Sequence, residues 1–285
     1  MGKKKKIKKL AKSSIQILQN GKIKVSKNQK IDLKPYITES IQNTVVSRLE
    51  GIISKEDVVL ETADLRLDSQ SHLTSDLDIA NLSAHASSAI TNTIVLTVPK
   101  KKALESFNFL TDGTLGELLR TSTLASVYKA IKDKWVSLNE NDNTVFTNVL
   151  YVPDVVIFID PNTGSFNKKP YKINVIILAI PSPGKMTLPE DEITLTDEDV
   201  VKRIVEDEVD AAIKLGCKDL IINPFNNKIL SKNPDLAAKR WFAVTTSQRC
   251  IEQVHSIYFG IEREDLYITF NAARMPSLTE DPSIL

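Results

Sequence analysis

The chain has 285 residues, of which 42% are hydrophobic and 26% charged, so it is long enough to bury a large core. No apolar run approaches the roughly 20 residues of a membrane-spanning helix, and two cysteines, Cys217 and Cys250, argue against a disulfide framework. The net charge of +1 hides an asymmetry. The first 34 residues carry twelve lysines and one acid (+11), and the rest carry 25 basic and 35 acidic residues (−10).

The basic N-terminal segment begins with an amphipathic pattern. Apolar residues recur at helical spacing, which predicts a helix over Lys3–Asn20 that ends at Gly21. Residues 22–33 alternate apolar and polar and predict a hairpin or short strands. The lysines at the start form a candidate interaction arm: Lys3, Lys4, Lys5, Lys6, Lys8 and Lys9.

The next segments predict strands over residues 57–66 and 92–98, with a helix over 75–85 between them. Residues 113–135 place apolar side chains on one face, which predicts one long helix with Asp112 as its N-cap.

Two continuous β-branched runs, residues 155–159 and 173–180, predict strands that are covered on both faces. Residues 161–170 are expected to form a turn between them. The proline-rich residues 181–192 are expected to form a loop.

A capping box opens the next helix, with Thr196 as the N-cap and Asp199 three positions later, and Gly216 ends it. Its predicted buried face consists of Val201, Ile204, Val205, Val209, Ala212 and Ile213. Cys217, directly after this helix, is predicted to be a small buried residue.

After a short apolar run, Pro234 is predicted to open a helix that extends to about residue 254. Residues 255–261 and 266–270 are expected to form strands, and 275–285 a tail without a core pattern. Strands that alternate with helices indicate an α/β fold with a mixed, largely parallel sheet and helices on both faces. We expect an N-terminal extension over 1–57, a core over 58–262, and a strand and tail over 263–285.

The segment from Leu220 to Pro234 resembles the motif L-V-L-G-A-W-G-C-G-V-F-x-N-D-P of the microbial-type poly(ADP-ribose) glycohydrolases, a macrodomain family. The two align without a gap, but Asn223, Asn226 and Lys228 stand where the family has glycine. Bulkier side chains hinder the approach of backbone N–H groups to a diphosphate, and a proline has no N–H to donate. The remnant of this ligand loop is Asn223, Pro224, Phe225, Asn226, Asn227 and Lys228.

Four other segments resemble family motifs in the same order along the chain. They are residues 11–21 (I-A-x-E-T-L-x-I-L-x-x-G), 118–124 (L-C-R-x-S-x-L), 152–160 (S-P-D-V-x-V-F-R-D) and 173–181 (a strand ending in A-A-P). The resemblance covers about residues 8–262 and implies a three-layer macrodomain.

The catalytic motifs of that family do not recur here. In the family, a G-G-G loop followed by Q-E-E holds the ribose and supplies the acid, and neither occurs between Thr97 and Arg120. Glu117 aligns only with a gap of one residue, and a lone glutamate near a helix start more often stabilises the helix dipole. We therefore assign no catalytic residue and retain Glu117 as the weak candidate.

Other candidate sites are weaker. His72, His85 and His255 are dispersed and have no second ligand at metal spacing, so we expect no metal and no cofactor. Ser122 lacks the G-x-S-x-G frame of a nucleophile. Trp135 and Trp241 lie on predicted helices and are expected in the core.

The sequence thus favours a pseudoenzyme: a non-catalytic macrodomain-like assembly protein that binds other protein subunits, for example in a phage virion. Two alternatives stay open. One is a divergent ADP-ribose hydrolase or reader, and the other is a nucleic-acid-binding accessory protein that uses the lysine-rich N-terminus. Without a signal-peptide pattern, we expect an intracellular or virion location and no membrane contact.

Overall fold

A computed structural model describes residues 3–24, 30–49, 73–74, 92–105, 107–109, 111, 113–140, 147–160, 164–180, 184–187, 192–261 and 263–274. The predictions for residues 57–66, 75–85, Asp112 and 275–285 lie outside these ranges.

Within the described residues, the main sheet has seven strands in the order β3-β6-β7-β5-β10-β11-β4. β3, β6 and β7 pair antiparallel, whereas β7, β5, β10, β11 and β4 are parallel neighbours. The mixed, largely parallel α/β fold is therefore confirmed. The strands are β3 (Val45–Arg48), β4 (Leu73–Thr74), β5 (Thr93–Pro99), β6 (Asn148–Ile159), β7 (Phe166–Ile180), β10 (Asp219–Ile222) and β11 (Ser256–Gly260).

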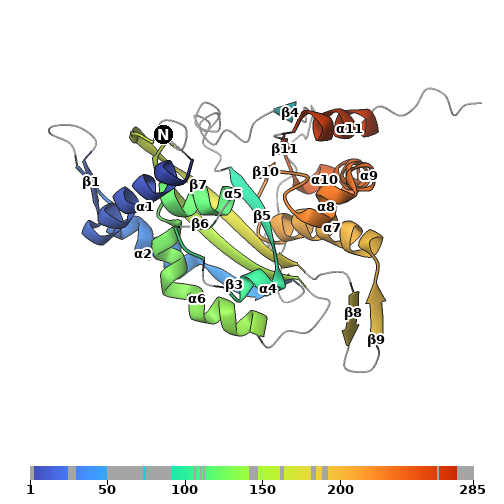
Figure 1. The fold of residues 1–285 in the computed structure, drawn as a ribbon, viewed down its shortest axis with the longest axis horizontal. Helices are drawn as coiled ribbons and strands as arrows, with labels where there is room; N and C mark the ends of the chain where they lie inside the picture. The colour runs from blue at the N-terminus through green and yellow to red at the C-terminus, as the bar shows by residue number, and fades with distance from the viewer. Residues whose placement is uncertain are drawn as a thin grey trace, which may run out of the picture.

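Helices cover both faces of the sheet, which makes three layers (Figure 1). One face carries α2 (Lys34–Asn43), α4 (Lys100–Ala103), α5 (Gly113–Thr121) and α6 (Leu124–Glu140). The other carries α7 (Asp197–Lys214), α8 (Lys228–Lys232), α9 (Pro234–Thr245), α10 (Gln248–Gln253) and α11 (Glu264–Arg274). Trp135 and Trp241 are completely buried, one in each of the two cores, as predicted.

The N-terminal segment forms a lobe on the far part of β6, shown in blue at the left of Figure 1. It contains α1 (Lys3–Asn20), β1 (Lys22–Lys24), β2 (Lys30–Asp32) and α2, so the predicted helix and hairpin are confirmed. Ile17, Ile23 and Leu33 pack on Val156 and Phe158 of β6 in a separate hydrophobic cluster. We call residues 3–43 the N-terminal lobe.

A bulge in β6 lies between the sheet proper and this lobe. The pairing of β6 with β7 shifts register between Val152 and Val155. Asp154 has a positive φ of 55°, and its backbone N–H donates to Oδ1 of Asn174 at 3.1 Å. Before the bulge, Val152 faces the core under α6, and after it Val155 faces the same core.

The single helix predicted over residues 113–135 is wrong, because the chain breaks between α5 and α6. The Ser122 hydroxyl donates to the carbonyl of Leu118 and accepts the N–H of Leu124. The backbone and hydroxyl of Thr123 both bond to the backbone of Val156 on β6. Side chains that bond to backbone groups compete with the helical hydrogen bonds and so end helices. The bonds of Thr123 to β6 stabilise the break.

The helix predicted over 234–254 is also broken, into α9 and α10, because the Ser247 side chain caps the second piece. The strand predicted over 266–270 is wrong. This segment lies in α11, where Leu266 and Phe270 are both buried at an i, i+4 spacing and acids occupy the first turn.

Two predicted loops contain strand. β7 begins at Phe166 within the turn predicted over 161–170, since Gly164 with a φ of +68° reverses the chain early. The loop predicted over 181–192 contains the antiparallel strands β8 (Gly184–Thr187) and β9 (Glu192–Leu195). The capping box of Thr196 and Asp199 and the glycine stop at Gly216 are confirmed.

Candidate functional site

The candidate site lies at the carboxyl ends of the neighbouring strands β5 and β10. These parallel strands are paired from Leu220–Thr93 to Ile222–Val95. After β5 the chain passes to α4 on one face, whereas β10 is reached from β7 through α7 on the other. Ligands of open α/β sheets bind at such a change of direction, outside the carboxyl ends of the strands.

A polar network fills this edge. The Thr97 hydroxyl, near the end of β5, donates to Oδ1 of Asn226 at 2.5 Å. Nδ2 of Asn227 lies 3.2 Å from the Thr97 oxygen and 3.0 Å from Oδ1 of Asn226. Two asparagines of the ligand loop are thus fastened to the neighbouring strand through their side chains.

The network continues into α7 through a buried carboxyl group. Glu208 is completely buried, and its Oε1 accepts a 3.1 Å bond from Nδ2 of Asn226. Burial raises the pKa of Glu208 well above its ordinary value, against the smaller effect of the Asn226 bond. Glu208 therefore holds the loop from within the helical layer, at a place where burial disfavours its charged form.

The remaining loop residues are also fixed. Oδ1 of Asn227 accepts the N–H groups of Ile229 and Leu230, so it caps α8. The indole N–H of Trp241 donates to the carbonyl of Pro224 at 3.2 Å. Because the cap uses these two N–H groups, they are not available to a phosphate.

Lysines supply positive charge at the same edge. Lys101 and Lys102, on α4 directly after β5, are exposed, and so is Lys228 at the start of α8. In this chain the ammonium group of Lys228 stands where the family motif has a glycine. Phosphate recognition would therefore rest on charge rather than on backbone N–H groups.

Glu117 does not lie at this edge. Ser122, at the end of α5, forms a β-bridge with β6 at the level of Tyr171, whereas Thr97 pairs with Leu178 of β7. Seven residues of strand at about 3.3 Å each place these levels roughly 23 Å apart. Glu117 precedes Ser122 by five residues, or about 7.5 Å of helix, which leaves roughly 15 Å or more along the strand direction.

The helix turn before Glu117 is tightly packed. A Cβ atom on Gly116 would lie 1.6 Å from the carbonyl oxygen of Thr111. Arg120 fixes that oxygen by donating to it at 2.8 Å and to the carbonyl of Phe109 at 2.9 Å. No side chain can occupy position 116 unless this loop moves.

Glu105 is another carboxylate near this edge. This exposed carboxylate follows α4, and its backbone N–H donates to the carbonyl of Lys102. Six residues of mostly helical chain separate it from Pro99, which places it about 9 Å from the end of β5. It lies shortly after a predicted strand, in the segment where the family resemblance places the catalytic loop.

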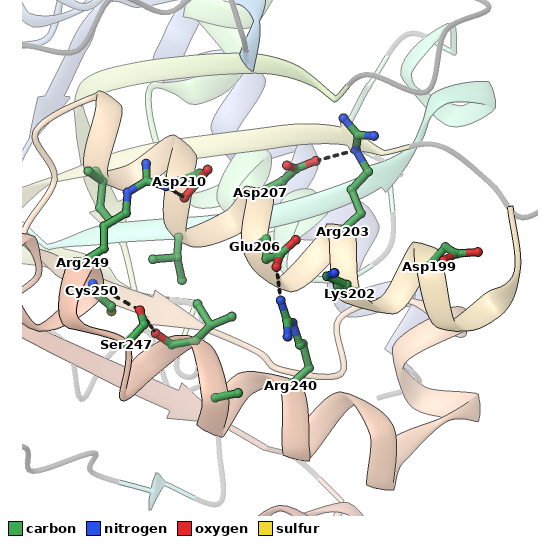
Figure 2. Close-up of a pocket in the computed structure, with 14 residues that line it drawn as sticks. Asp199, Lys202, Arg203, Glu206, Asp207, Asp210, Arg240, Ser247, Arg249 and Cys250 are labelled. Atoms are coloured by element: carbon green, nitrogen blue, oxygen red, sulfur yellow. Dashed lines mark hydrogen bonds and ion pairs between the residues drawn. The ribbon is translucent and has the colours of Figure 1, made fainter. Parts of the chain in front are cut away.

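A charged groove of about 670 Å³ lies between α7 and the pair α9–α10 (Figure 2). Ion pairs bridge it: Glu206 pairs with Arg240, and Asp210 with Arg249 at 2.7 Å. These pairs join the helices across the groove, so we interpret it as a braced helix seam and not as the ligand site.

Asp207 lies at the inner border of this groove. Its carboxylate accepts the Thr147 hydroxyl and lies 3.5 Å from Nε of Arg203. Burial nevertheless raises the pKa of Asp207 to about 6, because desolvation outweighs both of these contacts.

Within the described ranges, no three His, Cys, Asp or Glu side chains are grouped so that they could hold a metal ion. The described helices include none that is long and apolar enough to cross a membrane. His255 is exposed, and Cys217 and Cys250 are buried free thiols, as expected for Cys217. His72 and His85 lie outside the described residues.

Solved structures that match this fold include bacterial poly(ADP-ribose) glycohydrolases. The enzyme from Thermomonospora curvata matches with a TM-score of 0.70 at 14% identity, over 94% of this chain and 98% of that chain. Its complex with the inhibitor ADP-HPD matches with a TM-score of 0.68 at 14% identity, over 93% and 98%. The Deinococcus radiodurans enzyme in complex with ADP-ribose matches with a TM-score of 0.60 at 15% identity, over 84% and 96%.

By sequence, no protein-family model and no curated protein matches the chain. The fold is nonetheless that of the microbial poly(ADP-ribose) glycohydrolases, as the sequence motifs predicted. The prediction of a pseudoenzyme is contradicted by the comparison, because the structures that share the fold are glycohydrolases. Nothing in the comparison supports a structural or virion role.

Proposed function

We propose that this chain is a divergent hydrolase that binds an ADP-ribosyl group at the carboxyl ends of β5 and β10 and cleaves its glycosidic bond. The observation that carries the proposal is the network of Thr97, Asn226, Asn227 and Glu208, which orders the ligand loop at the place where this class of sheet binds ligands. Structural neighbours that hold ADP-ribose or ADP-HPD support the ligand class.

Recognition would use side chains in place of glycine N–H groups. Lys101, Lys102 and Lys228 carry the charge that a diphosphate requires. The amides of Asn226 and Asn227 and the hydroxyl of Thr97 form the floor of the edge and orient the adjoining ribose hydroxyls. This arrangement tolerates the loss of close backbone approach, because an ammonium group reaches the phosphate over several methylenes.

For catalysis we assign the acid to Glu105 rather than to Glu117, because only Glu105 follows the strand end at this edge. The glycosidic C–O bond breaks as Glu105 gives its proton to the leaving oxygen. Water then adds to the anomeric carbon, and the proton that the water loses restores Glu105. A positioned acid contributes about 10²–10⁴ in rate.

The test combines binding and turnover. Titration calorimetry with ADP-ribose should detect binding by the full chain, and Lys101→Ala/Lys102→Ala/Lys228→Ala should weaken it. Release of ADP-ribose from poly(ADP-ribose) and from a mono-ADP-ribosylated peptide should be measured by chromatography. Glu105→Gln should lower kcat by about 10²–10⁴ and leave binding intact.

Glu117→Gln is the matched control and should retain full activity. Binding without release of ADP-ribose would refute the hydrolase and leave a reader. Activity that Glu105→Gln leaves unchanged would refute the assignment of the acid. Absence of both binding and release would refute the proposal as a whole.

A further inference from the structure

Arg120, near the end of α5, is a buried arginine whose side chain reaches back to the chain that precedes the helix. Its Nη1 donates to the carbonyl of Phe109 at 2.9 Å and to the carbonyl of Thr111 at 2.8 Å. Both carbonyls belong to residues 104–111, which join α4 to α5 and which we call the linking segment. One guanidinium nitrogen therefore fixes two points of this segment.

The linking segment lies directly on the backbone of α5. A Cβ on Gly116 would lie 1.6 Å from the carbonyl oxygen of Thr111 and 3.0 Å from Nη1 of Arg120. The absence of a side chain at position 116 thus leaves the space in which the oxygen and the guanidinium meet. This contact is specific to the two residues, because any side chain at position 116 would separate them.

Arg120 is itself held from the other side by the N-terminal lobe. The hydroxyl of Ser14 on α1 donates to the backbone carbonyl of Arg120, and Ser14 is completely buried. The lysines on the remaining surface of α1, Lys8, Lys9 and Lys12, are exposed. The lobe therefore supports α5 at the residue that holds the linking segment.

Glu105 lies in the linking segment between fixed points. Before it, Ala103 of α4 is completely buried. After it, the ring of Phe107 lies 4.9 Å, centroid to centroid, from the ring of Tyr128 on α6. The two carbonyls that Arg120 binds come next along the chain. An exposed carboxylate is thus carried by a backbone that is anchored on both sides.

We propose that Arg120 is a positioning residue for Glu105, an inference that rests on the proposed function. Arg120 acts through the linking segment, which it keeps against α5 so that Glu105 stays within reach of the leaving oxygen. A displacement of a catalytic group by about 1 Å can cost about 10² in rate. Lysine cannot replace the arginine, because its single ammonium on a flexible stem lacks the planar, rigid set of donors.

The experiment is a double-mutant cycle on the release of ADP-ribose from poly(ADP-ribose) by the full chain. Arg120→Lys should lower kcat about 10- to 100-fold and leave KM within about twofold. In the Glu105→Gln background, the same substitution should lower kcat by less than about twofold, because the acid that Arg120 positions is already gone. A purely structural role would give the same fold loss in both backgrounds.

Arg240→Lys is the matched control. Arg240 is a partly buried arginine of α9 that pairs with Glu206 across the charged groove, and its replacement should leave kcat native. The number of ADP-ribose sites in calorimetry should be the same in all variants, which shows that each is folded.

Hydrogen exchange read by mass spectrometry tests the anchoring without any activity. Peptides that cover residues 104–111 should be protected in the wild-type protein and should exchange at least about tenfold faster in Arg120→Lys. Arg240→Lys should keep the wild-type rate in these peptides.

Three results would overturn the positioning role: native kcat in Arg120→Lys, equal fold losses in the two backgrounds of the cycle, or a linking segment that exchanges in the wild-type protein as fast as an unstructured peptide. If the wild-type protein releases no ADP-ribose, the proposed function fails, and the role of Arg120 in it fails too. Loss of the role alone is recognised by an active wild-type protein with an indifferent Arg120→Lys.

Discussion

The side-chain amide of Asn226 donates to the buried carboxyl of Glu208 across 3.1 Å, and this bond joins the ligand loop to the middle of α7. Asn226 also accepts from Thr97, so one side chain connects β5, the loop and the helical layer. The geometry of the edge therefore depends on a residue that no ligand can touch, because Glu208 is completely buried.

Two substitutions at Glu208 should distinguish the loss of its ionisable group from the loss of the whole side chain. Glu208→Gln keeps an acceptor oxygen for Asn226 and cannot ionise, so it should not lower the free energy of unfolding at pH 6. Glu208→Ala leaves the amide without an acceptor and opens a cavity, which should cost about 2–4 kcal/mol. Urea denaturation of both variants checks this. Equal losses for Gln and Ala would show that the bond to Asn226 is unimportant.

Asp207 should make stability fall as pH rises. Its pKa is raised to about 6 from the ordinary value of 3.8, so the folded state binds more protons than the unfolded state between these values. The contribution of Asp207 to the free energy of unfolding is fully present below about pH 4. It decreases by roughly 3 kcal/mol as pH rises through 6. Asp207→Asn should flatten this dependence in urea denaturation curves from pH 4 to 7. A native slope in the variant would contradict the assignment.

Gly116→Ala should be strongly destabilising. The added Cβ would lie 1.6 Å from the Thr111 oxygen, and either the loop moves or Arg120 loses an acceptor. We expect a loss of about 3 kcal/mol or more, measured by thermal or urea unfolding. Gly113→Ala provides the comparison, because its Cβ would meet no atom within 4 Å and only its φ of +71° costs energy, about 1–2 kcal/mol. A smaller loss for Gly116→Ala than for Gly113→Ala would contradict the close contact.

Asn227→Asp should distinguish the two roles of this residue. The carboxylate keeps the cap on α8, so stability should change by less than about 1 kcal/mol. It cannot donate to Thr97 or Asn226, so ADP-ribose affinity should fall by roughly tenfold in calorimetry. Asn227→Ala should lose both the cap and the affinity. Unchanged affinity of Asn227→Asp for ADP-ribose would show that the network is not part of the ligand site.

The features that the sequence predicts well are local ones. The capping box of Thr196 and Asp199 and the glycine stop at Gly216 each involve residues within one turn, and each is confirmed. The runs at 155–159 and 173–180 identify strands because both faces are covered, which leaves no polar alternation.

The errors have a common physical cause. The break at Ser122–Thr123 depends on bonds to Val156, which is more than thirty residues away in sequence. Residues 266–270 predict a strand because their short apolar pattern fits either period, and the packing of α11 on α9 decides in favour of helix. The motif remnant predicts the ligand loop, but the attachment of Asn226 to Glu208 joins two segments that no local pattern connects.

The bulge at Pro153–Asp154 sets the phase of β6. Val152 and Val155 face the same core although three positions separate them, and Val156 and Phe158 are thereby turned toward the N-terminal lobe. Deletion of Asp154 would exchange the two faces of the outer half of the strand, so the lobe would meet Val155 and Ile157 instead. The number of residues in the bulge therefore cannot change by one without detaching the N-terminal lobe from β6. The edge of the sheet at Thr97 would stay intact.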